Sequence, residues 1–346
     1  MTEFKERVTR PSSPRKIARG VSKCSSSSIL RRPPSRMSVR RALALLIIGL
    51  LARDRRARGM VLSSSQAEVT HLHRFAVKGL DRDVLQSVTL QPGDAFPLDR
   101  RWALIRADRT HQFDPDAPSW IHKQEFLCAF TRNELLASFE TSVRDDTSEL
   151  VVRSRDSSTE LLRARLDDID GGGRARVEAF FSHAAGEPVA LVRASEGTPH
   201  AHQFGNTGSG LSASGDVRTI HLVNARTVDA LAAAAGVALD PGRFRANVIL
   251  DGLEPWAEFS WVGRHFQLGS ARLNCIKRTV RCAGVNVDAR TGSGRADLDI
   301  PALLTRHFPQ HGPYLGVYAQ VVSAGEVRIG DRARVESATE RTPYGG

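Results

Sequence analysis

Cysteine is scarce in this sequence, and the few cysteines are not arranged in close pairs. Four occur in 346 residues, and no Cys-x-x-Cys motif is present. Small secreted domains that rely on disulfides contain far more cysteine, and iron–sulfur clusters need several closely spaced thiolates. The sequence therefore excludes a disulfide scaffold and an intrinsic iron–sulfur module, and it favours a reducing compartment.

Several catalytic signatures are also missing. There is no Gly-x-Ser-x-Gly hydrolase elbow and no Gly-x-Gly-x-x-Gly dinucleotide fingerprint, and the run at 205–210 lacks the Lys-Ser/Thr of a phosphate-binding loop. Two His-x-His pairs, His71/His73 and His200/His202, have no third ligand at suitable spacing, which argues against a zinc site. The sequence therefore gives no support for a common hydrolase, a dinucleotide-binding domain or a zinc site.

Positive charge is concentrated at the amino-terminal end. The formal net charge is +11, yet residues 1–60 alone hold 16 Lys and Arg against three acids. The remaining residues carry 33 basic and 35 acidic side chains, so the body of the chain is close to neutral. No nucleic-acid partner is therefore expected of the folded part, although a strongly basic protein would ordinarily suggest one.

Residues 1–65 are expected to form a disordered basic leader, because they are rich in Arg, Ser and Pro. The apolar run at 42–52 is shorter than the roughly 20 residues of a spanning helix. A basic cluster follows this run directly, which argues against an export signal. Two interpretations stay open: translation starts near Met60 and the protein is cytoplasmic, or the leader targets an organelle or anchors the protein to a membrane.

The rest of the sequence is typical of a mainly β protein. Short alternating or β-branched runs are separated by glycine turns, which favours a curled, barrel-like sheet over a doubly wound one. The Gly-Gly-Gly run at 171–173 is the best internal break. We predict an amino-terminal β-barrel-like domain at 66–170, a second β-barrel domain with a few short helices at 174–336, and a disordered tail at 337–346.

Two local patterns make more detailed predictions. His71, His73, Phe75 and Val77 share one face of a strand by period two, so Lys78 points to the opposite face. Further along, Thr227 is expected to cap a short alanine-rich helix.

The two cysteines near the carboxyl terminus differ in their surroundings. Ala271, Leu273 and Cys275 alternate along one strand face, so Cys275 is expected to be a small core residue. Cys282 follows the end of this alternation and comes directly after Arg281. Nearby cations favour the thiolate, which is the form that attacks electrophiles and binds soft metals. From the residues alone, Cys282 is either a buried apolar residue or such a thiolate.

A set of cations outside the leader lies at strand edges and turns. Its members are Lys78, Arg100, Arg101, Arg243 and Arg245, with Asn247 two residues further on. Arginine offers a planar fork to phosphate or pterin-like oxygens, and asparagine supplies both a donor and an acceptor. Scattered arginines usually solvate a surface, so this set does not define a site without a further constraint.

Several motifs occur in the order of a known family. They are Arg-Phe-Arg-Ala-Asn at 243–247, Arg-Cys followed by Val-Asp-Ala-Arg-Thr-Gly within 281–292, and the strand-rich run at 314–331. These residues resemble the MOSC domain, named after the carboxyl-terminal domain of molybdenum cofactor sulfurase. The runs His-Leu-His-Arg-Phe-Ala-Val-Lys-Gly-Leu and Phe-Pro-Leu-Asp-Arg-Arg are similar to the β-barrel domain of the amidoxime-reducing proteins. Together the resemblance covers roughly residues 68–336.

The resemblance implies a mainly β protein that holds a molybdenum cofactor, a molybdopterin, between two domains. In the family the cysteine of the Arg-Cys pair ligates the metal, and a Lys and several Arg and Asn side chains contact the pterin and its phosphate. The corresponding residues here are Lys78, Arg100, Arg245, Asn247, Arg281 and Cys282. Binding of pyridoxal phosphate is a weaker association at the family level.

Three positions depart from the family pattern. Gly79 stands where the reductases have a serine after the lysine, so one hydroxyl for the phosphate is missing. Ala246 and Ala289 replace prolines, which relaxes two turns. None of these changes removes an implied metal ligand, but the substrate cannot be carried over.

The resemblance implies an oxidoreductase that reduces small N-oxygenated compounds, with Cys282 as catalytic residue and metal ligand. Electrons are expected from a separate ferredoxin- or cytochrome-type protein. The alternative is a sulfur carrier that uses a persulfide on the same cysteine, or a cofactor-binding protein without turnover. A nucleic-acid-binding module driven by the leader is a third hypothesis, which the near-neutral body disfavours.

Overall fold

The computed structural model describes the chain after the leader, in several ranges. These are residues 66–94, 96–114, 121–128, 131–144, 146–194, 218–288, 290 and 296–336. The expected leader and tail, the His200/His202 pair, the glycine-rich run at 205–210 and Ala289 lie outside them. Across the described part no helix is long and apolar enough to cross a membrane.

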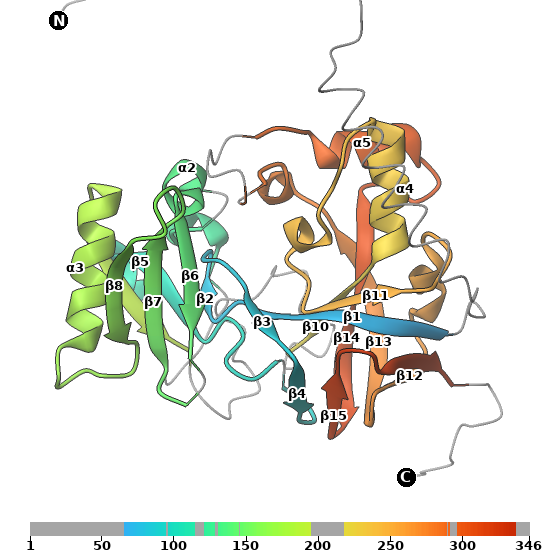
Figure 1. The fold of residues 1–346 in the computed structure, drawn as a ribbon, viewed down its shortest axis with the longest axis horizontal. Helices are drawn as coiled ribbons and strands as arrows, with labels where there is room; N and C mark the ends of the chain where they lie inside the picture. The colour runs from blue at the N-terminus through green and yellow to red at the C-terminus, as the bar shows by residue number, and fades with distance from the viewer. Residues whose placement is uncertain are drawn as a thin grey trace, which may run out of the picture. The chain divides into compact units, whose positions relative to one another are not determined.

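Seven strands close into a β-barrel, as expected for a mainly β fold (Figure 1). In order around the barrel they are β11 (Val248–Asp251), β10 (Ile220–Asn224), β14 (Tyr314–Ser323), β13 (Ala271–Val280), β12 (His265–Leu268), β16 (Arg332–Val335) and β1 (Gln66–Arg74). Pairing between β1 and β11 completes the ring. Neighbouring strands are antiparallel except β10 and β11, which run parallel. The short strand β3 (Asp83–Leu85) extends the sheet beyond β1.

The barrel interior is filled by the apolar face of each strand. Along β13, Ala271, Leu273 and Cys275 are fully buried while the residues between them are not, which confirms the predicted alternation. Burial in this apolar core raises the pKa of Cys275 to about 12. Cys275 is therefore an inert core residue, as predicted.

Two helices, α4 (Ala225–Ala235) and α5 (Ile300–His307), lie together at one end of the barrel (Figure 1). The prediction that Thr227 caps α4 is wrong. Asn224 is the cap, since its side chain accepts a hydrogen bond from the backbone of Arg226 at 3.1 Å. Thr227 is buried one turn inside and donates to Glu258 at 3.0 Å, so a tertiary contact replaces the expected local one.

The segment between β1 and β10 forms smaller sheets beside the barrel. One contains β2 (Val77–Lys78), β5 (Trp102–Arg106) and β9 (Val189–Arg193), and another contains β6 (Phe139–Val143), β7 (Glu149–Ser154) and β8 (Glu160–Arg165). A further pair joins β4 (Ser87–Leu90) to β15 (Gly325–Arg328). Helices α2 (Asn133–Ala137) and α3 (Gly173–Ala185) belong to this region, and α3 packs on β8 and β9.

The division into two domains is not confirmed. Strand β1 comes from the expected amino-terminal domain, yet it is part of the barrel. Strand β9 follows the predicted boundary at 171–173, yet it pairs with β5 on the other side of that boundary. Both strands connect the two expected domains through backbone hydrogen bonds.

A β-bulge interrupts β1 just before the expected face begins. A register shift between Val69 and His71 inserts a β-bulge, and the alternation changes phase there. As a result His71 is exposed and Leu72 is buried. His73 and Phe75 are buried as expected. His71 shares the face of His73, with 5.7 Å between their ring centres, but it is exposed.

Candidate cofactor site

The structure brings four of the expected cofactor-binding residues together. We call Lys78, Arg100, Arg245 and Arg281 the cation cluster. Lys78 ends β2, Arg100 precedes β5, Arg245 follows the short 3-10 helix η4 (Pro241–Phe244), and Arg281 follows β13. Their mutual repulsion appears in their pKa values: Arg100 and Arg245 lower that of Lys78, and Arg100 lowers that of Arg245.

Two members of the cation cluster have strained backbones. Arg100 has a φ of 51° and Arg245 a φ of 53°, in the left-handed region that residues other than glycine rarely adopt. Such strain persists only where the surrounding structure imposes it, and it is common at functional sites. Here the backbone N–H of Arg100 donates to the carbonyl of Phe75 at 2.7 Å. The side chain of Asp99 accepts from the backbone of Phe75 at 2.7 Å, which fastens the same loop to the end of β1.

Aromatic rings and carbonyl groups hold the guanidinium groups of the cation cluster. The buried ring of Phe75 lies 5.1 Å from the guanidinium carbon of Arg100 and 4.2 Å from that of Arg245. Arg245 also donates to the carbonyl of Leu80 at 2.9 Å. These contacts orient the cations through their π and dipole interactions and do not neutralise them. Arg100 in addition pairs with the carboxylate of Asp99.

Arg281 is held in the same way as Arg100 and Arg245. Its Nη2 donates to the carbonyl of Phe244 at 2.9 Å, and its guanidinium carbon lies 5.3 Å from the ring centre of Phe244. Burial lowers the pKa of Arg281 below its ordinary value. An arginine fixed on a carbonyl and a ring keeps its charge available to an anion.

The cluster carries more positive than negative charge. Burial, together with the neighbouring cations, lowers the pKa of Lys78 to about 8 and that of Arg245 to about 10. The nearby carboxylates are Asp99, which pairs with Arg100, and Asp81. An anion such as a phosphate would relieve this repulsion, so the residues present fit the phosphate of a pterin cofactor.

Cys282 is exposed at the edge of the cation cluster. It precedes the 3-10 helix η6 (Ala283–Val285), and its charge acts on the pKa of both Arg281 and the buried Tyr318. The thiol is thus accessible and adjacent to a cation, in contrast to buried Cys275. Of the two interpretations from sequence, the buried apolar residue is excluded for Cys282.

Asn247 occupies a different kind of position. It is 1% exposed, its Oδ1 accepts from the backbone of His221 at 3.1 Å, and its Nδ2 donates to the carbonyl of His73 at 3.2 Å. Its amide therefore links β10 to β1 beneath the cation cluster. Direct contact between Asn247 and a cofactor stays a prediction.

The glycine in place of the family's serine has a steric cause here. Gly79 has a φ of +90°, and a Cβ atom at this position would lie 2.6 Å from the carbonyl oxygen of Leu127 and 2.7 Å from the Cα of Cys128. The backbone of the segment that carries Cys128 therefore occupies the space of a side chain. Cys128 in turn acts on the pKa of Lys78 and Arg245, so a second thiol lies near the cluster. Nothing in the sequence pattern indicated this neighbour.

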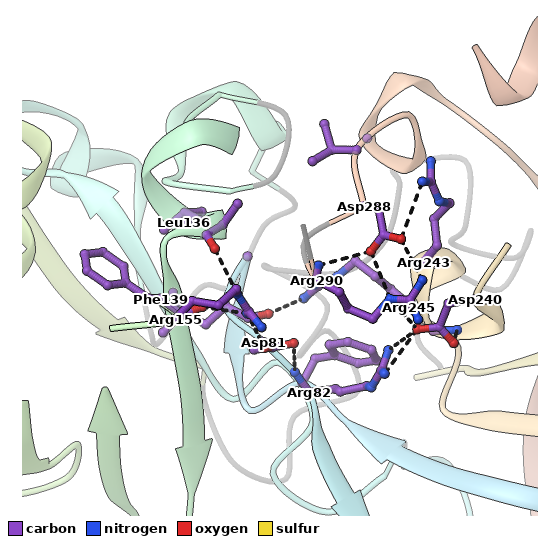
Figure 2. Close-up of a pocket in the computed structure, with 17 residues that line it drawn as sticks. Asp81, Arg82, Leu136, Phe139, Arg155, Asp240, Arg243, Arg245, Asp288 and Arg290 are labelled. Carbon is purple, nitrogen blue, oxygen red and sulfur yellow. Dashed lines mark hydrogen bonds and ion pairs between the residues drawn. The ribbon is translucent and has the colours of Figure 1, made fainter. Parts of the chain in front are cut away.

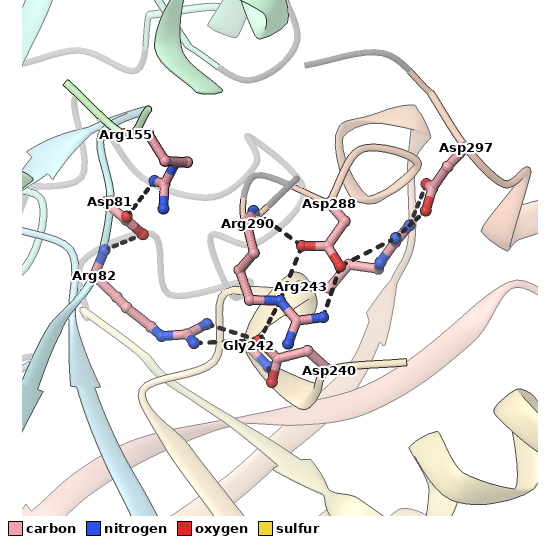
Figure 3. Close-up of polar contacts among 9 residues, drawn as sticks. All are labelled: Asp81, Arg82, Arg155, Asp240, Gly242, Arg243, Asp288, Arg290 and Asp297. Atoms are coloured by element: carbon pink, nitrogen blue, oxygen red, sulfur yellow. Dashed lines mark hydrogen bonds and ion pairs between the residues drawn. The ribbon is translucent and has the colours of Figure 1, made fainter. Parts of the chain in front are cut away.

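A pocket beside the cluster has a different composition (Figure 2). Phe75, Arg245 and Gly284 belong to its wall, which places it next to both the cluster and Cys282. Most of its charged residues, together with Asp297 behind Arg243, form alternating pairs, which we call the ion-pair group (Figure 3). The members are Asp81, Arg82, Arg155, Asp240, Arg243, Asp288, Arg290 and Asp297.

Carboxylates hold the arginines of the ion-pair group. Arg155 donates to Asp81 at 2.7 Å, and Arg290 donates to Asp288 at 2.7 Å. Burial alone would raise the pKa of Asp288, but the hydrogen bonds and charge of Arg290 lower it below its usual value. Each charge in this group has an opposite charge beside it, so the group adds no net attraction for an anion.

Two cations of the set noted in the sequence are not part of the cluster. Arg243 belongs to the ion-pair group, where it contacts Asp297 at 2.5 Å. Arg101 is buried near Arg193 and Arg218, and burial lowers its pKa to about 10. Within the described ranges, no three His, Cys, Asp or Glu side chains are grouped as a metal site.

Comparison with known proteins gives one family match. Residues 202–334 match the family model of the MOSC domain. At the family level this domain is associated with the molybdenum cofactor. No curated protein matches the chain. The similarity to amidoxime-reducing proteins does not appear in these comparisons and stays a prediction.

Several solved structures are similar at low identity. The YuaD protein of Bacillus subtilis matches 79% of this chain and 96% of its own, with 13% identity and a TM-score of 0.37. YiiM of Geobacillus stearothermophilus matches 34% of this chain and 54% of its own, with 18% identity and a TM-score of 0.27. YiiM of Escherichia coli has the same coverage and identity with a TM-score of 0.25. Likeness at this level carries no functional conclusion.

Proposed function

We propose that this protein binds a molybdenum cofactor and reduces small N-oxygenated compounds with electrons from a separate redox protein. The observation that supports it is the position of Cys282. Its exposed thiol lies beside Arg281, at the edge of a cluster whose guanidinium groups are held by rings and carbonyls. A soft metal ligand and an anion-binding cluster at one place suit a metal bound to a phosphorylated pterin.

Each residue has a distinct role in this proposal. Cys282 would hold the metal through its thiolate, while Lys78, Arg100 and Arg245 would hold the anionic part of the cofactor. Arg281 would supply a fixed positive charge between the metal ligand and the residues that bind the anion. When bound, the molybdenum supplies two-electron oxygen-atom chemistry, which no side chain of the protein can perform.

The proposed reaction consumes electrons and protons that must be supplied to the protein. Reduction of a hydroxylamine to an amine breaks the N–O bond and releases the oxygen as water, with two electrons and two protons consumed. The electrons would come from a ferredoxin- or cytochrome-type donor. The pocket that contains the ion-pair group opens beside Cys282 and is the candidate entrance for the substrate.

The test combines metal analysis with turnover. Full-length protein purified from a host that makes molybdopterin should contain about one molybdenum per chain, and Cys282→Ser should contain almost none. Cys275→Ala, which removes a core thiol from the preceding strand β13, should keep its metal. Wild type should reduce a hydroxylamine when a reduced ferredoxin or cytochrome is supplied and should be inactive with NADH alone. Wild-type protein that contains no molybdenum would contradict the proposal.

A sulfur carrier is the second candidate, because an exposed thiol beside a cation also suits a persulfide. Sulfane sulfur on Cys282 in protein without molybdenum would favour this alternative. Sulfur that appears equally in Cys282→Ser would reject it.

A further inference from the structure

The buried histidine of β10 contacts the arginine that precedes Cys282. Nε2 of His221 lies 3.4 Å from Nη1 of Arg281, and the imidazole packs against the ring of Tyr318 with 5.1 Å between ring centres. His221 is 2% exposed. A guanidinium can only donate hydrogen bonds, so Nε2 of His221 must be the acceptor in this contact.

An imidazole that accepts at Nε2 carries its hydrogen on Nδ1 when it is neutral. The backbone carbonyls of Arg245 and Leu315 are the other hydrogen-bond partners of the ring. The carbonyl of Arg245 also accepts from Nη2 of Arg100 at 3.4 Å. The strained backbone of Arg245 thus presents one carbonyl to both Arg100 and His221, and His221 connects Arg281 to the rest of the cation cluster.

The space for this ring depends on a glycine of the neighbouring strand. Gly316 on β14 has a φ of +83°, and a Cβ atom there would lie 2.9 Å from Nε2 of His221. Burial, with the charges of Arg281 and Arg100, keeps the pKa of His221 well below its ordinary value, so the ring is neutral at physiological pH. A protonated ring would place a third positive charge against these two arginines.

We propose that His221 is a positioning residue, whose neutral imidazole accepts a hydrogen bond from Arg281 and holds that guanidinium beside the thiol of Cys282. Arg281 has two anchors, the carbonyl of Phe244 on Nη2 and the imidazole of His221 on Nη1. Its Nε is buried and has no hydrogen-bond partner among the described residues. Loss of either anchor would therefore release the charge from its place next to Cys282.

This inference concerns the site of the proposed function, but its test uses protein without cofactor. The probes are iodoacetate and iodoacetamide, which alkylate the same thiol and differ in charge. A fixed cation beside Cys282 accelerates the anionic reagent relative to the neutral one. The ratio of the two rates at Cys282, followed by peptide mass spectrometry, reports the position of Arg281 whether or not the protein ever binds molybdenum.

Two conservative variants separate the two hydrogen bonds of the ring. His221→Gln can still accept from Arg281, whereas His221→Asn keeps only a donor near the position of Nδ1. We expect His221→Gln to keep the rate ratio within about two-fold of wild type, and His221→Asn to lower it about five-fold. His73→Gln is the matched control, since His73 is a histidine of similar burial on β1, which does not pair with β10. It should leave the ratio unchanged.

A second measurement needs no variant. The 15N chemical shifts of the His221 ring in wild-type protein should show a neutral imidazole with its hydrogen on Nδ1. An Nε2–H tautomer would overturn the proposal, because Arg281 then has no acceptor there. Equal effects of His221→Gln and His221→Asn on the rate ratio would also overturn it, since they would indicate a merely structural role. Absence of molybdenum would instead contradict the proposed function alone.

Discussion

The cation cluster and the ion-pair group are neighbours, and they hold their arginines in opposite ways. In the ion-pair group each guanidinium contacts a carboxylate, as Arg155 contacts Asp81 and Arg290 contacts Asp288. In the cation cluster Arg245 and Arg281 are held by rings and carbonyl oxygens. Carboxylates neutralise a guanidinium, whereas rings and carbonyls orient it and leave its charge. The first arrangement stabilises a fold, and the second is suited to an external anion.

One buried carboxylate, that of Glu258, shows the effect of burial on a charge of the opposite sign. Glu258 is 1% exposed, and its oxygens accept from Thr227 and Asn224 at 3.0 Å each. Burial raises its pKa to about 7, although these hydrogen bonds act in the opposite direction. A buried charge that has only neutral partners therefore moves toward its uncharged form, whichever its sign. Lys78 behaves in the same way with the opposite direction of shift.

The largest effect on stability is expected where a paired charge loses its partner. Arg243→Met should lower the free energy of unfolding by about 3 kcal/mol, because Asp288 and Asp297 would keep their charges without this partner. The Arg243 side chain is 2% exposed and that of Asp288 is 12% exposed. Urea denaturation measures the change. Arg290→Met is the matched control within the ion-pair group. Its side chain is 53% exposed, so we expect a loss below about 1 kcal/mol.

The next effect concerns Glu258 and has a defined pH dependence. The raised pKa means that the native state binds this proton more tightly than the unfolded chain does. The resulting stabilisation is complete below a pH of about 4.5 and is lost as the pH rises through about 7. Glu258→Gln cannot bind this proton. The difference in the free energy of unfolding between wild type and variant should therefore change by up to about 3 kcal/mol over that pH range. Identical pH profiles of the two proteins in chemical denaturation would contradict this interpretation.

Removal of one cation from the cation cluster should weaken cofactor binding without lowering the stability of the protein. Arg245→Met should reduce the pterin and molybdenum content of the purified protein roughly ten-fold or more, since a charge-assisted hydrogen bond to an anion is lost. Its melting temperature without cofactor should stay the same or rise, because repulsion with Arg100 is relieved. Arg82→Met, in the ion-pair group, should show the reverse pattern of lower stability and normal cofactor content. The same pattern in both variants would abolish the distinction between the two regions.

The smallest effect is a pH dependence of anion binding. The pKa of Lys78 is about 8 in the ligand-free protein, so an anion that needs the charged ammonium must bring a proton with it above that pH. Affinity of cofactor-free protein for a phosphate monoester, measured by calorimetry, should fall roughly ten-fold as the pH rises from about 8 to about 9.5. Lys78→Met should bind more weakly at neutral pH and lose this dependence. A steep pH dependence that persists in Lys78→Met would assign it to another group.

The members of the cation cluster could be predicted because their motifs are local. Arg245, Arg281 and Cys282 lie within short runs whose order matches a family, and Cys275 was separated from Cys282 by strand periodicity alone. The alanine-rich helix α4 was also predicted from its local pattern. These features depend on neighbours along the chain, which a sequence displays directly.

The features that were predicted wrongly or not at all depend on contacts between distant segments. The bulge in β1 changes which side chains are buried after Val69, so that Leu72 is buried and His71 is exposed. It depends on the pairing of β1 with β11, and no local pattern reports that partner. Glu258 draws Thr227 away from the expected helix cap. His221 reads as one more residue of an apolar strand, and its role appears only when β10, β13 and β14 are assembled.

The position of β1 has a consequence for how the protein folds. This first described strand closes the barrel against β11, and a hydrogen bond from Thr70 to Ile249 spans 179 residues. The same strand leads directly into Phe75, against which Arg100 and Arg245 stack. Long-range strand pairing is slow because chain ends must first meet. Barrel closure should therefore be a late kinetic event, and ligand-binding competence should emerge together with it rather than with the earlier local hairpins.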